Sequence, residues 1–294
     1  MASLFRGSAV ALVTPFRDGR VDVPAIERLT EMQIAGGTKS IIACGTTGEP
    51  ATMTADEREL VVKTVVKAAK GRIPIVAGTG SNCTQTVAET AKRYEDLGCA
   101  AQLVVTPYYN KTTQEGMYRH FMYVAEHSKL PVIVYNVPGR TTLDISPDVL
   151  ERLAECDKFI GLKESSYNLP YVMEKIRRVQ GRMAVYSGND DLAWPLMAVG
   201  AEGVISVVAN VLPEQMAKLA DSALAGDAKT ALETQMKLLP LCRALFAETS
   251  PIPCKQAMEW LGLCSAELRL PLIPVSDVTA KQLREALVEL GVQL

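Results

Sequence analysis

The sequence of 294 residues is poor in the residue types that build most metal and redox sites. It has only two histidines, His120 and His127, and its seven cysteines include no CxxC pair. So few histidines make a histidine-based metal site or a Ser-His-Asp triad a poor expectation. An odd number of cysteines without paired spacing is typical of buried thiols in a reducing compartment. We therefore expect a cytoplasmic protein with neither a disulfide framework nor a metal centre.

Long hydrophobic runs and an excess of charge of one sign are also lacking. No stretch approaches the roughly 18 uninterrupted apolar residues of a transmembrane helix. The net charge is -2, and acidic and basic residues are interspersed. The apolar run near the N-terminus stops at Thr14 and Pro15 without a cleavage site, which favours a first strand over a signal or transit peptide. We expect a soluble protein that binds neither membranes nor nucleic acids.

Hydrophobic residues make up 48% of the chain, enough for a large core, and eight short runs are nearly continuously apolar. Such runs are expected of strands that are covered on both faces. They occupy residues 8–14, 40–44, 74–80, 101–106, 131–137, 159–165, 183–189 and 203–208. Helical signals lie between them. Thr54 and Glu57 form a capping-box pattern, and Gly71 follows as a stop. Ser146 is a candidate N-cap before Pro147.

The alternation of strands and helices predicts an α/β fold, a (β/α)8 TIM barrel with a C-terminal helical extension. The alternative, a doubly wound sheet, needs a glycine-rich phosphate-binding fingerprint after the first strand, and "VTPFRDGRVD" has none. We place the barrel at residues 1–225 and the extension at 226–294. Three helices are expected in the extension, at residues 228–248, 253–263 and 279–291.

Polar residues gather where the predicted strands end, and in such a barrel these ends meet at one mouth. They are Gly45–Glu49, Thr106–Asn110, Tyr135, Asn136, Arg140, Lys163, Glu164 and Ser187–Asn189. A lysine in this position is partly desolvated, and desolvation favours the neutral amine, a nucleophile that forms imines with ketones. Two phenols, Tyr135 and Tyr109, and a threonine hydroxyl could relay protons there. The glycines and hydroxyls of "GTTGE" suit one carboxylate and Arg140 suits a second.

The motifs "GTTGE", "TPYYN", "YNVPGRT", "IGLKES", "YSGND" and "GVISVVAN", in this order, resemble the dihydrodipicolinate synthase family. The likeness runs from about residue 5 to "LRLPLIP" near the C-terminus. Relatives such as N-acetylneuraminate lyase share the barrel, the lysine and a GxTGE loop. The double threonine at 46 and 47 and the Arg140 motif look specific to the synthases. The resemblance therefore implies a member of the synthase family, which is a lyase, and not only a member of the wider class I aldolase superfamily.

The implied reaction condenses pyruvate with L-aspartate 4-semialdehyde on the diaminopimelate route to lysine, without metal or organic cofactor. The resemblance implies that Lys163 forms an imine with pyruvate, and that Thr46, Tyr135 and Tyr109 form a proton relay. Further implied roles are that Thr47 holds the pyruvate carboxylate, that Arg140 binds the semialdehyde carboxylate, and that Gly188 and Ile205 line the pocket. Tyr109 would complete the site of a neighbouring subunit in a homotetramer, a dimer of tight dimers.

Several positions depart from the pattern of lysine-inhibited members, which carry a serine, two histidines and a glutamate there. The residues here are Pro50, Ala55, Arg58 and Thr86. The ammonium group of an incoming lysine thus loses its carboxylate, and weak or absent feedback by lysine is expected. Asn189, where many relatives carry aspartate, receives no interpretation from the sequence.

Two alternatives stay open at this point. One is another imine-forming pyruvate aldolase that acts on a sugar acid or on 4-hydroxy-2-oxoglutarate, and Arg140 in its "VPGRT" context argues against it. The other is a non-catalytic barrel that serves as a scaffold, which would have no need of a lysine beside two phenols.

Overall fold

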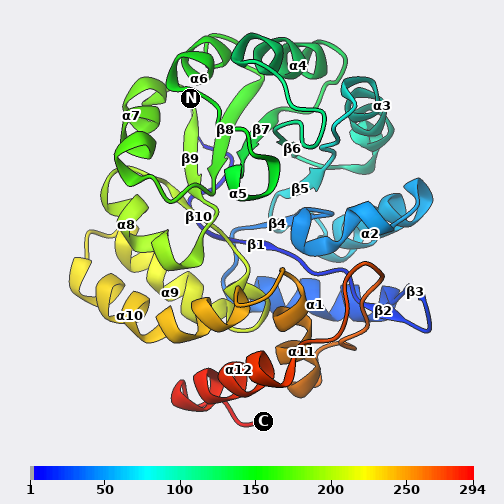
Figure 1. Cartoon of the computed structure of the whole chain (residues 1–294), viewed down its shortest axis with the longest axis vertical. Coiled ribbons are helices and arrows are strands. Elements are labelled where there is room, and N and C mark those ends of the chain that lie inside the picture. The colour runs from blue at the N-terminus through cyan, green and yellow to red at the C-terminus, as the bar shows by residue number, and fades with distance from the viewer. Residues whose placement is uncertain (1–2) are drawn as a thin grey trace.

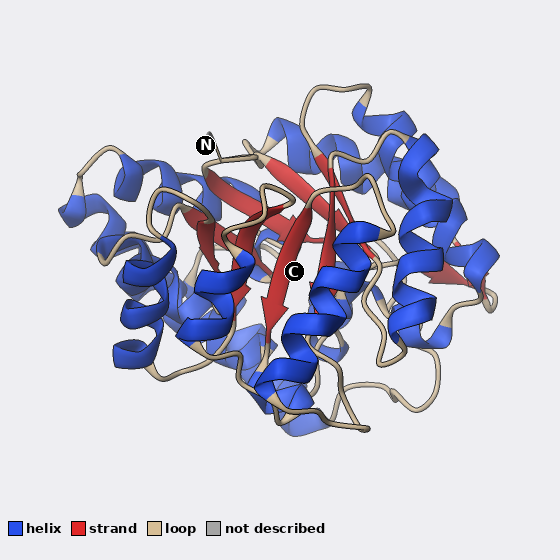
Figure 2. Cartoon of the chain, turned by 90° about the horizontal axis from the view of Figure 1, so that it is seen from above, coloured by secondary structure: helices blue, strands red, loops and turns tan. Residues whose placement is uncertain are grey.

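Eight parallel strands form a closed barrel at the centre of the molecule (Figures 1 and 2). The computed structural model describes residues 3–294. The barrel strands are β1 (Gly7–Ala11), β4 (Ser40–Ala43), β5 (Ile75–Gly78), β6 (Ala101–Val105), β7 (Val132–Asn136), β8 (Phe159–Glu164), β9 (Ala184–Ser187) and β10 (Gly203–Ser206). They follow one another around the barrel in chain order, and β10 closes it against β1. Seven predicted runs contain one of these strands, and the first, at 8–14, overlaps β1, which begins one residue earlier. The prediction of a TIM barrel is confirmed.

Helices lie between the strands and surround the barrel (Figure 2). They are α1 (Val23–Ala35), α2 (Ala55–Ala69), α3 (Thr84–Tyr94), α4 (Gln114–Glu126), α5 (Pro138–Thr141), α6 (Pro147–Leu153), α7 (Leu169–Val179), α8 (Ala193–Ala198) and α9 (Pro213–Leu224). The capping box of Thr54 and Glu57 is present at α2, and the Ser146 hydroxyl accepts a hydrogen bond from the Val149 amide at α6. At the end of α2, Lys70 takes the left-handed conformation with φ of 52°, one residue before the expected stop at Gly71.

A two-stranded hairpin, β2 (Phe16–Arg17) and β3 (Arg20–Val21), is an element that the sequence analysis missed. Its turn is Asp18-Gly19, and both residues have positive φ, 54° and 75°. Asp-Gly is a preferred pair for such a turn. The signal was present, but strands of two residues are too short for an apolar pattern to develop.

The C-terminal extension consists of α10 (Ala228–Leu245), α11 (Ile252–Trp260) and α12 (Asp277–Glu289), three helices as predicted. They lie along one side of the barrel beside α9 and α1 (Figure 1). Leu241 and Leu283 of the extension belong to the same buried cluster as Val10 and Ile26 of the barrel. The proposed division at residue 225 stays a prediction.

The cysteines are all unpaired, but they are not all buried. Four are buried, Cys99 and Cys156 are half-buried, and Cys83 is exposed. The expectation of buried thiols is therefore wrong for Cys83, which is the N-cap residue of α3 and lies at the surface. Among the described residues 3–294, no helix combines the length and the apolar character needed to cross a bilayer.

Candidate active site

Two adjoining cavities open where the barrel strands end. The first, which we call the threonine cavity because Thr46 lines it, has a volume of about 390 Å³. The second has a volume of about 860 Å³ and is lined by Ser165, Ser166 and Ser250, so we call it the serine cavity. Tyr135 and Arg140 line both. A ligand that spans the two cavities would therefore pass between a phenol and a guanidinium group.

Lys163 lies near the end of β8, directly opposite Tyr135 of β7 in the barrel register. Neighbouring residues in register point to the same face of a sheet, and the Lys163 Nζ atom lies 4.5 Å from the centroid of the Tyr135 ring. Only 5% of Lys163 is exposed. Within residues 3–294 its amine has a ring contact but no hydrogen bond or ion pair. This buried amine is free to act as a nucleophile.

Gly188, directly after β9, lies against the Lys163 side chain. A Cβ atom at Gly188 would lie 2.0 Å from the Ser165 Oγ atom and 3.0 Å from the Lys163 Cε atom. The first distance is shorter than real Cβ contacts and the second is tight, so an alanine here would push against the Ser165 and Lys163 side chains. Gly188 also lines the serine cavity, where the sequence placed it.

The "GTTGE" loop forms a single 3-10 turn, Thr46–Gly48, at the edge of the threonine cavity. The Gly48 amide donates to the Gly45 carbonyl, and the Gly48 carbonyl accepts a hydrogen bond from the Thr14 hydroxyl at 2.7 Å. Thr46 lines the cavity. Thr47 is buried, with 4% exposed, and is not among the residues that line either cavity.

Glu49 ties this loop to the C-terminal extension. Its carboxylate Oε1 lies 2.5 Å from the Lys255 Nζ atom of α11, and both side chains are buried. Lys255 also donates to the Glu267 carbonyl at 2.8 Å. Burial lowers the pKa of Lys255, and the Glu49 carboxylate opposes that shift. Since Glu49 directly follows the Thr46–Gly48 turn, Lys255 helps to fix the position of the threonines.

Arg269 provides a second tie between the extension and the barrel. Its guanidinium group donates to both oxygens of Glu57, at 2.6 and 2.8 Å, and to the Thr52 carbonyl. The paired hydrogen bonds give this contact a fixed geometry. The segment from Pro50 to Glu57 is thereby held under the C-terminal chain.

Sequence analysis missed three hydroxyl groups of the serine cavity. The Oγ atoms of Ser165, Ser166 and Ser250 are buried and, within residues 3–294, have no hydrogen-bond partner. An unsatisfied buried hydroxyl costs about 1–3 kcal/mol, so this cavity suits a polar ligand that supplies the partners. Ser165 and Ser166 directly follow β8, where the strand-end rule could have found them. Ser250 lies in a loop between α10 and α11, for which the sequence carried no signal.

The remaining predicted residues lie in three different surroundings. Arg140, from α5, donates to the Ser250 carbonyl at 3.3 Å and borders both cavities. Ile205 is fully buried in the barrel interior, in the same cluster as Tyr135, and lines neither cavity. Tyr109 is 91% exposed and lines neither cavity of its own chain. The structure therefore brings Thr46, Tyr135 and Arg140 to one cavity. Lys163 lines neither cavity but contacts Tyr135 and lies against Gly188, and Tyr109 lies apart.

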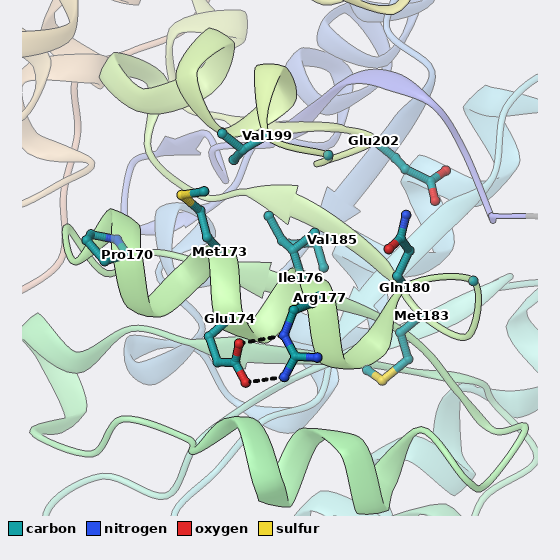
Figure 3. A pocket seen from close by; sticks show the side chains of 12 residues that line it. Pro170, Met173, Glu174, Ile176, Arg177, Gln180, Met183, Val185, Val199 and Glu202 are labelled. Carbon is teal, nitrogen blue, oxygen red and sulfur yellow. Dashed lines mark hydrogen bonds and ion pairs between the residues drawn. The ribbon is translucent and has the colours of Figure 1, made fainter.

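A third hollow, of about 580 Å³, lies between α7 and the segment from Val199 to Glu202 that leads from α8 into β10 (Figure 3). Glu174 and Arg177 form an ion pair at its edge, and Met173 and Val185 supply apolar walls. No predicted site residue lines it. Within the described part of the chain, no three histidine, cysteine or acidic side chains are grouped so that they could hold a metal ion.

Comparisons with known proteins agree on one family. The model of the Dihydrodipicolinate synthetase family matches residues 4–290. The 4-hydroxy-tetrahydrodipicolinate synthase of Anaeromyxobacter sp. (strain Fw109-5) is 46% identical over 289 residues, 98% of each chain. The dihydrodipicolinate synthase structure from Thermotoga maritima has a TM-score of 0.97 at 41% identity, covering 99% of this chain and 100% of that one. The chloride-inhibited synthase from Acinetobacter baumannii, complexed with pyruvate, has a TM-score of 0.96 at 45% identity, covering 98% and 99%.

The pair of Arg269 and Glu57 makes a testable contribution to stability. Hydrogen bonding to Arg269 lowers the pKa of Glu57 from 4.5 to about 2. A depressed folded-state pKa stabilises the protein at pH values above the unfolded-state pKa, and the contribution is lost as the pH falls toward about 2. We expect Glu57→Gln to lower the free energy of unfolding by about 1–2 kcal/mol at neutral pH, and by less at each step below about pH 5. Urea unfolding at several pH values measures this.

The control is Glu285→Gln, which removes an exposed partner of Lys281. This change should leave the free energy of unfolding within about 0.5 kcal/mol at every pH. A penalty for Glu57→Gln that does not vary with pH would show that packing, and not the charge, is responsible.

Proposed function

The chain belongs to the dihydrodipicolinate synthetase family, as its motifs predicted, and we propose that it condenses pyruvate with L-aspartate 4-semialdehyde through an imine on Lys163. The product is 4-hydroxy-tetrahydrodipicolinate, an intermediate on the diaminopimelate route to lysine. One observation carries this proposal: the Lys163 amine is buried, forms no hydrogen bond or ion pair within residues 3–294, contacts the Tyr135 ring and lies against the Gly188 backbone.

The chemistry begins with attack of the neutral Lys163 amine on the keto carbon of pyruvate. A carbinolamine forms and loses water to give the imine, which withdraws electrons from the methyl carbon. That carbon loses a proton, and the resulting enamine forms a bond to the aldehyde carbon of the semialdehyde. The amino group of the semialdehyde portion then displaces Lys163 and closes the ring. These steps move protons to the keto and aldehyde oxygens and from the methyl carbon. Because no histidine lines either cavity, other side chains must carry them.

Thr46, Tyr135 and Tyr109 carry these protons, and the Tyr135 ring contacts the amine. The position of Tyr135, opposite Lys163 in the register and shared by both cavities, supports its role. Thr47 holds the pyruvate carboxylate, supported by its place in the turn that Glu49 and Lys255 fix.

The semialdehyde occupies the serine cavity, where Arg140 binds its carboxylate. The unpartnered hydroxyls of Ser165, Ser166 and Ser250 support an acceptor that is rich in polar groups. Gly188 and Ile205 shape the space around the imine. Gly188 does so by direct approach, and Ile205 by packing below it in the barrel interior.

A homotetramer, arranged as a dimer of tight dimers, completes the proposal. Tyr109 has a positive φ of 68° and is 91% exposed, so its ring projects away from the site of its own chain. An exposed tyrosine of this kind suits contact with a second copy, whose site it completes. We place the enzyme in the cytoplasm.

The deciding experiment is a coupled assay of the wild type and Lys163→Ala with pyruvate, L-aspartate semialdehyde and dihydrodipicolinate reductase, following loss of NADPH. Turnover should fall at least about 1,000-fold in the variant, because no other nucleophile is placed to form the imine. Borohydride trapping with pyruvate should label Lys163 in the wild type. If pyruvate is trapped there but the semialdehyde is not consumed, the acceptor assignment is wrong and a sister aldolase activity replaces it.

Gly188 offers a test with a matched control. Gly188→Ala places a methyl group against Lys163 and Ser165, so trapping of pyruvate should slow by at least about tenfold. Gly139→Ala changes a glycine of the same cavity that has open space around its Cβ position, and should trap pyruvate within about twofold of the wild type. Equal rates for the two variants would remove Gly188 from the site.

Feedback by lysine should be weak or absent. Pro50 and Arg58 line the threonine cavity, and no carboxylate other than the paired Glu49 lines it. A lysine ammonium group would meet the Arg58 guanidinium without a free acidic partner. We expect less than about twofold inhibition at millimolar L-lysine. Half-maximal inhibition in the low-micromolar range would contradict this.

A further inference from the structure

Residues that directly follow the two central site residues lie on the opposite face of the barrel wall. Side chains alternate along a strand, so Asn136 and Glu164 point outward where Tyr135 and Lys163 point inward. The register pairs Asn136 with Glu164. Both are fully buried. The wall that carries the amine therefore has a polar outer side.

Lys175 of α7 meets this outer side with a fully buried ammonium group. Its Nζ atom donates to Glu164 Oε2 at 2.8 Å and to Asp144 Oδ1 at 2.5 Å. The Asn136 amide donates to Glu164 Oε1 at 2.8 Å and to Asp144 Oδ1 at 2.9 Å. We call Asn136, Asp144, Glu164 and Lys175 the outer charge cluster. It joins the ends of β7 and β8 to α7 and to the loop after α5.

The outer charge cluster carries two carboxylates and one ammonium group, with all three side chains packed behind the strand of Lys163. Glu164 accepts one further hydrogen bond, from the Ser166 amide at 2.8 Å. Loss of the Lys175 ammonium group would change the net charge of the outer charge cluster from -1 to -2.

We propose that Lys175 is a positioning residue for Lys163, and that its charge offsets the outer carboxylates and thereby sets the pH range over which Lys163 forms the imine. This inference rests on the imine of the proposed function. The Glu164 carboxylate and the Lys163 amine lie on opposite sides of one strand, on the order of 10 Å apart. A unit charge at that distance, with an effective dielectric constant of about 20, moves a proton equilibrium by roughly one pH unit.

The other groups around Lys163 are accounted for. Tyr135 faces it from β7, and Tyr186 is its register partner on β9. Asp190, after β9, is buried and interacts with Lys163 by charge, and its Oδ2 atom accepts hydrogen bonds from the amides of Val207 and Val208. None of these residues belongs to the outer charge cluster, so changes in the cluster leave them in place. Tyr171 faces Lys175 from its own helix, with 4.8 Å between Nζ and the ring centroid.

The test measures imine formation alone. The wild type, Lys175→Met, Glu164→Gln and the double variant are incubated briefly with subsaturating pyruvate at pH values from about 5.5 to 9.5 and quenched into borohydride at one fixed pH. Mass spectrometry counts the adduct on Lys163. The pH midpoint should rise by roughly one unit in Lys175→Met and fall by roughly one unit in Glu164→Gln. It should return close to the wild-type value in the double variant, whose net cluster charge again equals that of the wild type.

Lys158→Met is the matched control, because Lys158 precedes the other end of β8 and donates to the carbonyls of Ala125 and Ser128. Its pH midpoint should equal that of the wild type. Equal midpoints in all variants, or shifts of the two single variants in the same direction, overturn the inference. Should Lys175→Met fail to fold, Glu164→Gln and Asp144→Asn must both lower the midpoint. If the wild type forms no adduct on Lys163, the proposed function fails first.

Discussion

Lys163 places a primary amine near the end of a buried strand, and a buried amine with no hydrogen bond or ion pair among the described residues constrains everything packed around it. A carboxylate inside the mouth would pair with the ammonium form and remove the nucleophile. The inner surroundings accordingly offer a ring face from Tyr135 and a bare backbone from Gly188. The Asp190 carboxyl group, which interacts with Lys163 by charge, accepts hydrogen bonds from two backbone amides, and Glu164 and Asp144 pair with Lys175 on the outer side of the wall.

The C-terminal extension takes part in this arrangement more than its place at the end of the chain suggests. Lys255 holds Glu49 behind the threonine turn, Arg269 holds Glu57, and Ser250 contributes a carbonyl to Arg140. Shared hydrophobic packing with the barrel places these side chains. The barrel supplies the buried Lys163 amine, and the extension supports the Thr46–Gly48 turn and the segment from Pro50 to Glu57.

Much of the fold was predictable because parallel strands that are covered on both faces are apolar along their length, as in β7 and β8. The ends of those strands then located Lys163, Tyr135, Thr46, Arg140 and Gly188, since the barrel brings all eight ends to one mouth. Ser250 and Lys255 were not predicted, because each contacts a partner more than 100 residues away in the sequence and no local sequence pattern reports such a contact. Cys83 was misjudged because cysteine spacing carries no information on exposure.

The alternation of Lys163 and Glu164 also bears on how the chain finds its register. A slip of β8 by one residue would turn every side chain to the opposite face. Lys163 would then face Lys175, two buried ammonium groups together, and Glu164 would enter the apolar interior of the barrel without its donors. Such a misfolded barrel would carry a large electrostatic penalty. Lys163 and Glu164 thus favour the correct pairing of β8 over a pairing that is shifted by one residue.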